Sequence, residues 1–344
     1  MTLREEIFEQ AAVLQHLLDE EWQHVVEIAK EIQERKIKYV FLAARGTSDN
    51  AGLYAKYTLG IHNQIPVALA APSMFSIYQS PPVLEDALVL SLSQSGQSPD
   101  IVAVVNEGKQ KNVMTLAITN KPDSPMAKTS SHVIDIRAGE EKAVAATKSY
   151  TGELFAAAML SAALSQDESM RADLEKIPEY VAQALALEDV VRQAVDRYYY
   201  MKHCVVIGRG YNYATAFEWA LKLKEMTYVV AQAYSSADFL HGPIAMTEPS
   251  FPVFMVAPSG KVYPTQLEMA QKLKNEKNAN LLICSNEEEI LATSDAPIGL
   301  PVMPEWISPI VSIVPAQLFC LALANLRGLD TEHPRGLSKV TLTS

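Results

Sequence analysis

The stretch Val40-Phe41-Leu42-Ala43-Ala44-Arg45-Gly46 is a short apolar run that ends in glycine. A similar stretch, Cys204-Val205-Val206-Ile207-Gly208-Arg209-Gly210, follows 164 positions later. Two further pairs of apolar runs match at nearly the same spacing, namely residues 88–96 with 252–260 and residues 115–120 with 281–286. Two unrelated α/β domains would also place strands at similar intervals, but the shared Arg-Gly and Ser-Gly pairs favour an internal duplication.

The matched runs are apolar on both faces, which is typical of strands in a parallel sheet that is covered by helices on both sides. Helical periodicity follows in four stretches, residues 49–59, 98–110, 211–228 and 263–275. Alternating strands and helices predict an α/β protein with two doubly wound parallel-sheet domains of flavodoxin-like type, joined by helical connectors. In such sheets ligands bind outside the carboxyl ends of the strands.

The length of 344 residues is enough for about two domains. We expect an N-terminal helix (1–35), a first domain (36–165), a helical connector (166–199), a second domain (200–330) and a C-terminal tail that closes the active site (331–344). Thr2 is the expected N-cap of the first helix, and Pro178 is expected near a helix start or at a kink. The tail carries Leu337, Val340 and Leu342, so we expect it to be docked.

Composition excludes several classes of protein. The 49% of apolar and 20% of charged residues exclude disordered and collagen-like chains, and a net charge of −11 disfavours nucleic acid as a partner. Cys204, Cys284 and Cys320 lie in apolar surroundings typical of core thiols, and no Cys or His spacing suggests a metal site. The N-terminus lacks an apolar signal core, and polar residues interrupt the apolar stretches short of membrane-spanning length. We therefore expect a soluble cytoplasmic protein without metal or cofactor.

Two hydroxyl-rich loops form the candidate phosphate site. Gly46-Thr47-Ser48 follows the first strand, and Ser93-Gln94-Ser95-Gly96-Gln97-Ser98 follows the run at 88–92. Such turns offer backbone N–H groups, the positive end of a helix dipole and O–H donors to a phosphate monoester. The alternative is that these side chains only cap helices. The second half carries Arg209–Asn212 and Pro258–Lys261 instead, so the first half is predicted to bind the phosphate.

Four side chains are candidates for proton chemistry. Lys222 and Glu225 lie three positions apart on a predicted helix and share a face. His241 precedes Gly242-Pro243, a turn that fixes the backbone, and Lys339 lies near the C-terminus. Taken alone, these residues could be an exposed ion pair, a structural histidine and a solvated lysine.

The glycine and serine loops, with Ala220-Leu221-Lys222-Leu223-Lys224-Glu225 and Phe239-Leu240-His241-Gly242-Pro243, resemble the motifs of sugar isomerase (SIS) domains. Nearly the whole chain resembles the tandem-SIS isomerase half of glucosamine-6-phosphate synthases and the related aminosugar-6-phosphate deaminases. The resemblance implies that Glu225 moves a proton between C1 and C2 of an open sugar and that His241 opens the ring. It also implies that Lys222 lies beside this base and that Lys339 meets the carbonyl end of the substrate.

The chemistry fits these residue types, because a desolvated carboxylate with a raised pKa can serve as the base and imidazole can transfer protons near neutral pH. The resemblance further implies a homodimer in which His241 reaches the neighbouring subunit's site. The substrate contacts that it implies lie at Gly46, Thr47, Ser48, Ser93, Gln94, Ser95, Ser98, Val144 and Ala146.

Two departures from the synthases bear on the reaction. The sequence goes from Met1-Thr2-Leu3 directly into its first predicted helix, so we expect no glutaminase domain, and Ala146 stands where synthases usually carry serine. We therefore predict conversion of glucosamine 6-phosphate to fructose 6-phosphate and ammonia, with the gluco or galacto epimer left open. One alternative is a deglycase that acts on a fructosamine 6-phosphate. The other is a non-catalytic phosphosugar sensor, which the presence of Glu225 and His241 disfavours.

Overall fold

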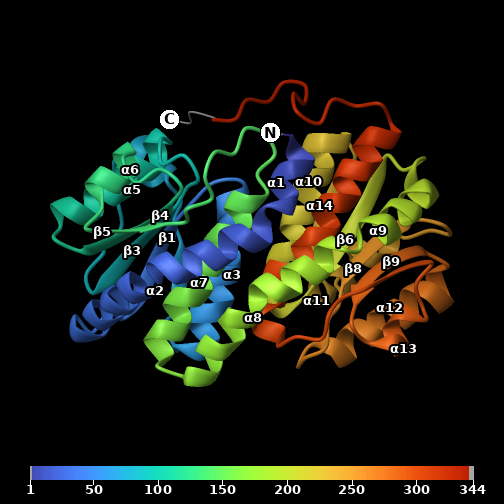
Figure 1. Cartoon of the computed structure of the whole chain (residues 1–344), viewed down its shortest axis with the longest axis horizontal. Helices are drawn as coiled ribbons and strands as arrows, with labels where there is room; N and C mark the ends of the chain where they lie inside the picture. The colour runs from blue at the N-terminus through green and yellow to red at the C-terminus, as the bar shows by residue number, and fades with distance from the viewer. Residues whose placement is uncertain (1, 341–344) are drawn as a thin grey trace. The chain divides into compact units, whose positions relative to one another are not determined.

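Two five-stranded parallel sheets organise residues 2–340, the part of the chain that the computed structural model describes (Figure 1). Each sheet is the centre of a compact unit, and we name the units after their strands. The β1–β5 unit comprises residues 9–141, 146–176 and the tail from Ser338. The β6–β10 unit comprises the residues up to Phe8, 142–145 and 177–337. The prediction of an α/β protein with two parallel sheets is confirmed.

The first sheet has the order β2-β1-β3-β4-β5. Its strands are β1 (Tyr39–Ala43), β2 (Val67–Leu69), β3 (Ala87–Leu92), β4 (Met114–Thr119) and β5 (His132–Asp135). β1 pairs with β3 in parallel register, Val40 opposite Leu88. From β1 the chain moves outward to β2, and from β3 it moves outward the other way to β4. The connections therefore diverge between β1 and β3, which is where open α/β sheets bind ligands.

Helices in two groups cover this sheet. One group packs together as α2 (Gln10–Glu34), α3 (Thr47–His62) and α7 (Lys148–Ser165). The other group consists of α4 (Ser73–Ser76), α5 (Pro99–Gln110) and α6 (Pro125–Thr129). Alternate residues of a strand face opposite sides, and Phe41 and Val89 pack with Ile101 and Val104 of α5 in one core cluster.

The second sheet repeats the first. Its order is β10-β9-β8-β6-β7. Read from the other edge, β7-β6-β8-β9-β10 matches β2-β1-β3-β4-β5 strand for strand. Its strands are β6 (His203–Gly208), β7 (Val230–Ser235), β8 (Pro252–Val256), β9 (Asn280–Ser285) and β10 (Ala296–Gly299). The three pairs of matched runs in the sequence become β1 and β6, β3 and β8, and β4 and β9. This correspondence confirms the internal repeat.

Helices again cover both faces of the second sheet. One group is α9 (Glu188–Val195), α10 (Tyr213–Thr227) and α14 (Ser308–Leu326). The other is α11 (Ser236–Leu240), α12 (Tyr263–Lys277) and α13 (Glu288–Leu291). Trp219 of α10, Phe254 of β8 and Phe319 of α14 pack with ring centroids 5.0–6.0 Å apart, so aromatic side chains fix α10 against the sheet and α14.

The predicted helical boundaries need three corrections. The helix expected over 1–35 is divided at Glu9 into α1 (Leu3–Phe8) and α2, with Thr2 accepting the Glu5 N–H as the predicted N-cap. The connector is divided into α8 (Glu168–Leu185), α9 and a short 3₁₀ turn, and Pro178 lies inside α8 rather than at its start. Contrary to expectation, one helical segment among residues 2–340, Glu305–Leu326, is long and apolar enough to cross a membrane, and 94% of its apolar window is buried.

The tail is docked where the structure describes it. The Arg335 N–H donates to the Tyr228 hydroxyl at 2.9 Å, and the Arg335 guanidinium lies 4.1 Å from the centre of the Tyr228 ring. Leu337 is half exposed and Val340 is partly buried, so hydrophobic burial of Leu337 contributes little to this docking. The predicted contact of Leu342 lies outside the described residues.

Candidate functional site

The two hydroxyl-rich loops lie at the same edge of the first sheet. Gly46 precedes α3 directly after β1, and Ser98 precedes α5 after β3. Because β1 and β3 are parallel neighbours, the amino ends of both helices start at the carboxyl edge where the connections diverge. Two helix amino ends at one edge give a set of N–H donors suited to an anion.

The backbone of the second loop is held in one shape by glycine. Gly96 has φ +60°, and a Cβ at this position would lie 2.1 Å from Ser124 Oγ. The Gln94 carbonyl accepts the Asn120 N–H at 3.2 Å, which ties the loop to the end of β4. Only glycine fits this conformation and this close approach, so the shape of the loop depends on Gly96.

The sequence left open that the serines of this loop only cap the following helix, and the structure does not show such capping. Ser98 is the N-cap residue of α5, yet its side chain makes no capping hydrogen bond. Ser93 Oγ accepts the Gly96 N–H at 3.1 Å, and Ser95 Oγ accepts the Gln97 N–H at 3.4 Å. A hydroxyl that accepts in this way keeps its O–H as a donor, which is what a phosphate oxygen requires.

Ser48 differs from the other predicted phosphate residues. Its Oγ donates to Glu153 Oε1 at 2.8 Å, so its hydroxyl hydrogen points to α7 in this structure. Glu153 is almost fully buried. Sequence reasoning did not find Glu153, although a carboxylate in the middle of an Ala-rich helix is an unusual feature that could have been noticed.

Glu141 binds the tail lysine. The Lys339 Nζ lies 2.6 Å from Glu141 Oε2, and Glu141 also accepts hydrogen bonds from the Thr147 and Ser149 N–H groups and the Ser149 hydroxyl. Burial alone would raise the pKa of Glu141, but the Lys339 charge and these hydrogen bonds outweigh it and lower the pKa. Lys339 is therefore held by a buried anion within the β1–β5 unit. Sequence reasoning did not find Glu141 either.

Val144 and Ala146 lie in the loop that Glu141 closes. Both are partly exposed, whereas Ala143 and Ala145 between and beside them are buried. Ala146 belongs to the β1–β5 unit, and Val144 belongs to the short segment 142–145 of the β6–β10 unit. The side chains predicted to contact substrate are thus the exposed members of an alternating pattern.

A buried charge cluster lies on α10. Lys222 Nζ is 2.5 Å from Glu225 Oε2 and 3.3 Å from Glu218 Oε1. Lys222 and Glu218 are almost completely buried, while the Glu225 side chain is 23% exposed. Burial lowers the pKa of Lys222, but the two carboxylates outweigh burial and raise it above its usual range. The lysine is therefore a permanent cation that orients Glu225, the one accessible carboxylate of the three groups.

The prediction that Lys222 and Glu225 share a face is confirmed, and the exposed ion pair is excluded because Lys222 is buried. Glu218 was missed. It precedes Lys222 by four positions, the spacing at which helical side chains meet, so the sequence does contain a signal for it.

His241 and Glu225 lie at opposite ends of β7. α10 ends at Thr227, directly before β7 begins, whereas His241 follows α11 after β7 has ended. A strand of six residues at about 3.3 Å per residue is roughly 20 Å long. Within one β6–β10 unit, His241 therefore does not join the Glu225 cluster. His241 is exposed, and so are Leu240 and Met246 beside it.

The equivalent of the phosphate site in the second sheet is filled by a carboxylate. Glu305 Oε2 accepts the Lys261 N–H at 2.8 Å. Gly260 has φ +147°, and a Cβ there would lie 2.3 Å from Glu305 Cδ. A Cβ on Gly210, in the equivalent of the first loop, would lie 3.9 Å from Glu305 Oε1. The carboxylate thus lies between the two loops of the second half.

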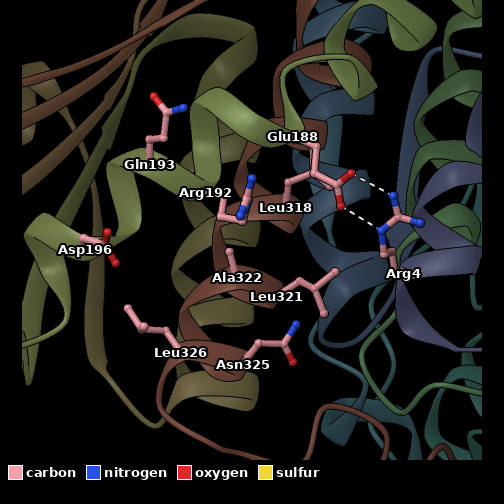
Figure 2. Close-up of a pocket in the computed structure, with 10 residues that line it drawn as sticks. All are labelled: Arg4, Glu188, Arg192, Gln193, Asp196, Leu318, Leu321, Ala322, Asn325 and Leu326. Atoms are coloured by element: carbon pink, nitrogen blue, oxygen red, sulfur yellow. Dashed lines mark hydrogen bonds and ion pairs between the residues drawn. The ribbon is translucent and has the colours of Figure 1, made fainter.

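A cavity of about 580 Å³ lies elsewhere in the β6–β10 unit (Figure 2). Leu318, Leu321 and Ala322 of α14 form its apolar part. Arg4 and Glu188 close one side with two hydrogen bonds of 2.7 Å. None of the predicted catalytic residues lines it, so this cavity is separate from the charge cluster on α10.

The remaining groups considered in the sequence are possible metal ligands and the three cysteines. Among residues 2–340, no three His, Cys, Asp or Glu side chains are grouped so that they could hold a metal ion. Cys204, Cys284 and Cys320 are buried free thiols, as predicted, and burial raises the pKa of Cys204 to about 12. They are core residues rather than nucleophiles.

Known proteins share both halves of this arrangement. A glutamine–fructose-6-phosphate aminotransferase (isomerizing) of Thermus thermophilus is 32% identical over 347 residues, which cover 97% of this chain and 57% of that protein. The chain thus spans about half the length of the curated relatives it matches.

Two solved structures match along the whole chain. A protein of Silicibacter pomeroyi described as a phosphosugar isomerase has a TM-score of 0.85 at 32% identity, over 96% of this chain and 100% of its own. The glucosamine-6-phosphate deaminase of Thermotoga maritima has a TM-score of 0.77 over the full length of both chains, at 24% identity, a likeness of fold alone. The SIS domain family matches residues 34–163 and 198–327. The chain therefore belongs to the SIS domain family, as a tandem of two SIS domains resembling the isomerase part of the aminotransferases.

Proposed function

We propose that this chain is a phosphosugar isomerase that converts glucosamine 6-phosphate and water to fructose 6-phosphate and ammonia. The observation that carries the proposal is the Glu218–Lys222–Glu225 cluster, because it presents one accessible carboxylate that a buried cation keeps oriented. The hydroxyl-rich loops of the β1–β5 unit support it, since they suit the phosphate of such a substrate.

In the proposed reaction His241 opens the sugar ring, and Glu225 removes the proton from C2 of the open aldose. That proton returns to C1 while O1 gains a proton and the amine nitrogen gives one up, which leaves an imine at C2 that water hydrolyses to the ketose and ammonia. The negative charge that develops on O1 is stabilised by an ammonium, and we assign this role to Lys339. Glu141 keeps this lysine in place within the unit that carries the phosphate loops.

The deaminase direction is favoured over synthesis by Ala146, which replaces a serine usual in the synthases that the chain resembles. The fold of the Thermotoga maritima deaminase, matched over its full length, is compatible with this direction. A deglycase that releases an amino acid from a fructosamine 6-phosphate would use the same proton transfer, so only the size of the amine pocket distinguishes it.

We further propose that the active protein is a homodimer in which His241 of one chain serves the Glu225 of the other. The support is the separation of these residues by the length of β7 within one chain. Ring opening breaks the bond between C1 and the ring oxygen, and the proton then moves from C2 to C1 of the same sugar, so both groups must reach one substrate molecule.

The test is turnover with three substrates. The protein is incubated with glucosamine 6-phosphate, galactosamine 6-phosphate and a fructosamine 6-phosphate, and ammonia, free amino acid and fructose 6-phosphate are measured. Release from the third substrate alone would establish the deglycase, and binding of all three without turnover would establish the sensor.

The first prediction concerns Glu225. Glu225→Gln removes the base while keeping the size of the side chain, so we expect kcat to fall at least about 100-fold with little change in the affinity for sugar phosphate. Glu268→Gln, at an exposed position of α12, is the matched control and should keep full activity. Unchanged turnover by Glu225→Gln would remove this residue from its role.

A further inference from the structure

Arg45 lies between the two phosphate loops. It follows β1 and directly precedes Gly46, and its Nε donates to Asp100 Oδ2 at 2.8 Å. Asp100 is in the first turn of α5, two positions after Ser98, and is 1% exposed. The arginine side chain thus crosses from the end of the first strand to the start of the helix that follows the second loop.

The Arg45 guanidinium has N–H donors besides the one that bonds to Asp100. Arginine carries five N–H donors, and the ion pair with Asp100 engages Nε. The side chain is 50% exposed, so part of the guanidinium is accessible from solvent while Nε pairs with Asp100. Asp100 lies at the positive end of α5, which offsets part of the carboxylate charge, so the arginine keeps an attraction for a second anion.

The duplicated half supplies an internal comparison. Arg209 stands where Arg45 stands, but Pro264 replaces Asp100 at the second position of the equivalent helix, α12. Arg209 Nη1 instead lies 3.5 Å from Ser236 Oγ, and the space between the loops holds Glu305. The half in which Glu305 joins the two loops therefore lacks the arginine–aspartate pair, and the half with the hydroxyl-rich loops has it.

We propose that Arg45 is a phosphate-binding residue of this site, and that Asp100 is the positioning residue that aims its guanidinium. The proposal rests on the proposed function only in taking a sugar phosphate as the ligand. The serine and threonine hydroxyls give neutral donors, and Arg45 adds the positive charge that selects the dianionic ester over a neutral sugar.

The test measures binding without turnover. Glucitol 6-phosphate has no carbonyl group, so its affinity can be measured by calorimetry whether or not the protein is a deaminase. We expect Arg45→Met to weaken its binding about 10- to 100-fold. Arg35→Met removes a half-exposed arginine that pairs with Glu31 in the same unit, and it should leave the affinity unchanged.

A second measurement distinguishes a phosphate-binding role of Arg45 from a strut, that is, a purely structural role in which Arg45 only joins the two loops. In the complex, a guanidinium beside the phosphate favours the dianion, so the second pKa of the bound phosphate, followed by ³¹P NMR, should be lower in the wild type than in Arg45→Met. Arg45→Lys keeps the charge but loses the planar fork, so it should bind more weakly and still show the low phosphate pKa.

The outcomes are distinct. Wild-type affinity of Arg45→Met, or weaker binding with an unchanged phosphate pKa, would overturn the proposal. If Arg45→Met does not fold, Arg45→Gln carries the test, because it also removes the charge, and a strut would leave the phosphate pKa unchanged in it. If glucosamine 6-phosphate is not turned over while Arg45-dependent binding persists, the proposed function fails and this inference stands.

Discussion

Lys222 is held between two carboxylates inside α10, so the three groups depend on one another. With the lysine removed, Glu218 would stay buried without its cation, and Glu225 would lose the contact that aims it. An uncompensated buried charge costs more than an exposed one, because water cannot reach it. The cluster is therefore expected to serve stability and proton transfer at the same time.

The second prediction is that Lys222→Met lowers the free energy of unfolding by about 3 kcal/mol and abolishes turnover. Lys224→Met, at an exposed lysine of the same helix, should change neither. Thermal unfolding and steady-state kinetics measure both effects. A fully stable Lys222→Met variant would mean that the carboxylates are not ionised in the folded protein.

The third prediction concerns pH. The pKa of Lys222 is raised on folding above its ordinary value of 10.5, so its contribution to stability is complete below that pH. The contribution is lost as pH rises above 10.5 toward the folded pKa, because the unfolded chain gives up this proton first. Urea unfolding of the wild type should lose stability in that alkaline range, and Lys222→Met should lack this component of the loss.

At the scale of the elements, the Glu305 carboxylate packs closely against the loop that contains Gly260. The Lys261 N–H, at the start of the turn into α12, bonds to a side chain rather than to a ligand. This contact joins the loop after β8 to the segment before α14, and a Cβ on Gly260 would clash with the carboxylate.

The fourth prediction is a double-mutant cycle on this pair. Gly260→Ala places a Cβ against Glu305 at an unfavourable φ and should lower the free energy of unfolding by about 2 kcal/mol. In the Glu305→Ala background the steric part disappears, so the cost of the same change should fall by about 1 kcal/mol. Urea denaturation measures each variant. Gly299→Ala, where nothing lies within 4 Å of the added Cβ, is the control, and additive costs would contradict the fit.

The sequence was sufficient to predict elements whose signal is local. Apolar runs such as 88–92 and the periodicity of 98–110 correspond to β3 and α5 within one or two residues. The same approach missed Glu141, Glu153, Glu218 and Glu305. Each looks like an ordinary solvated carboxylate in sequence, and only tertiary contacts bury it or give it a partner. The helix over 305–326 shows the reverse case, because an apolar segment suited to a membrane is buried in a core.

At the scale of the whole molecule, the separation of Glu225 and His241 along β7 means that a folded chain does not bring together the two residues that we propose to transfer protons. The exposed Leu240 and Met246 beside His241 are consistent with a surface that another chain covers. The oligomeric arrangement therefore decides whether the proposed reaction can take place.

The fifth prediction is complementation between two inactive variants. Glu225→Gln and His241→Asn should each be inactive alone. After unfolding and refolding together, half of the dimers are mixed, and one of the two sites in each mixed dimer has both native residues. Activity should therefore return to about one quarter of the wild type. Refolding each variant alone is the control, and no recovery in a mixture shown by mass to contain hybrids would exclude a shared site.

The duplication also has a consequence for how the two halves have diverged. The positions in α3 that correspond to Glu218, Lys222 and Glu225 are Tyr54, Thr58 and Ile61, which carry no charge. The hydroxyl-rich loops of the first half thus accompany an uncharged helix, and the charged helix of the second half accompanies loops that Glu305 joins. Under the proposed function, an isolated half would therefore carry either the phosphate loops or the carboxylate base, but not both.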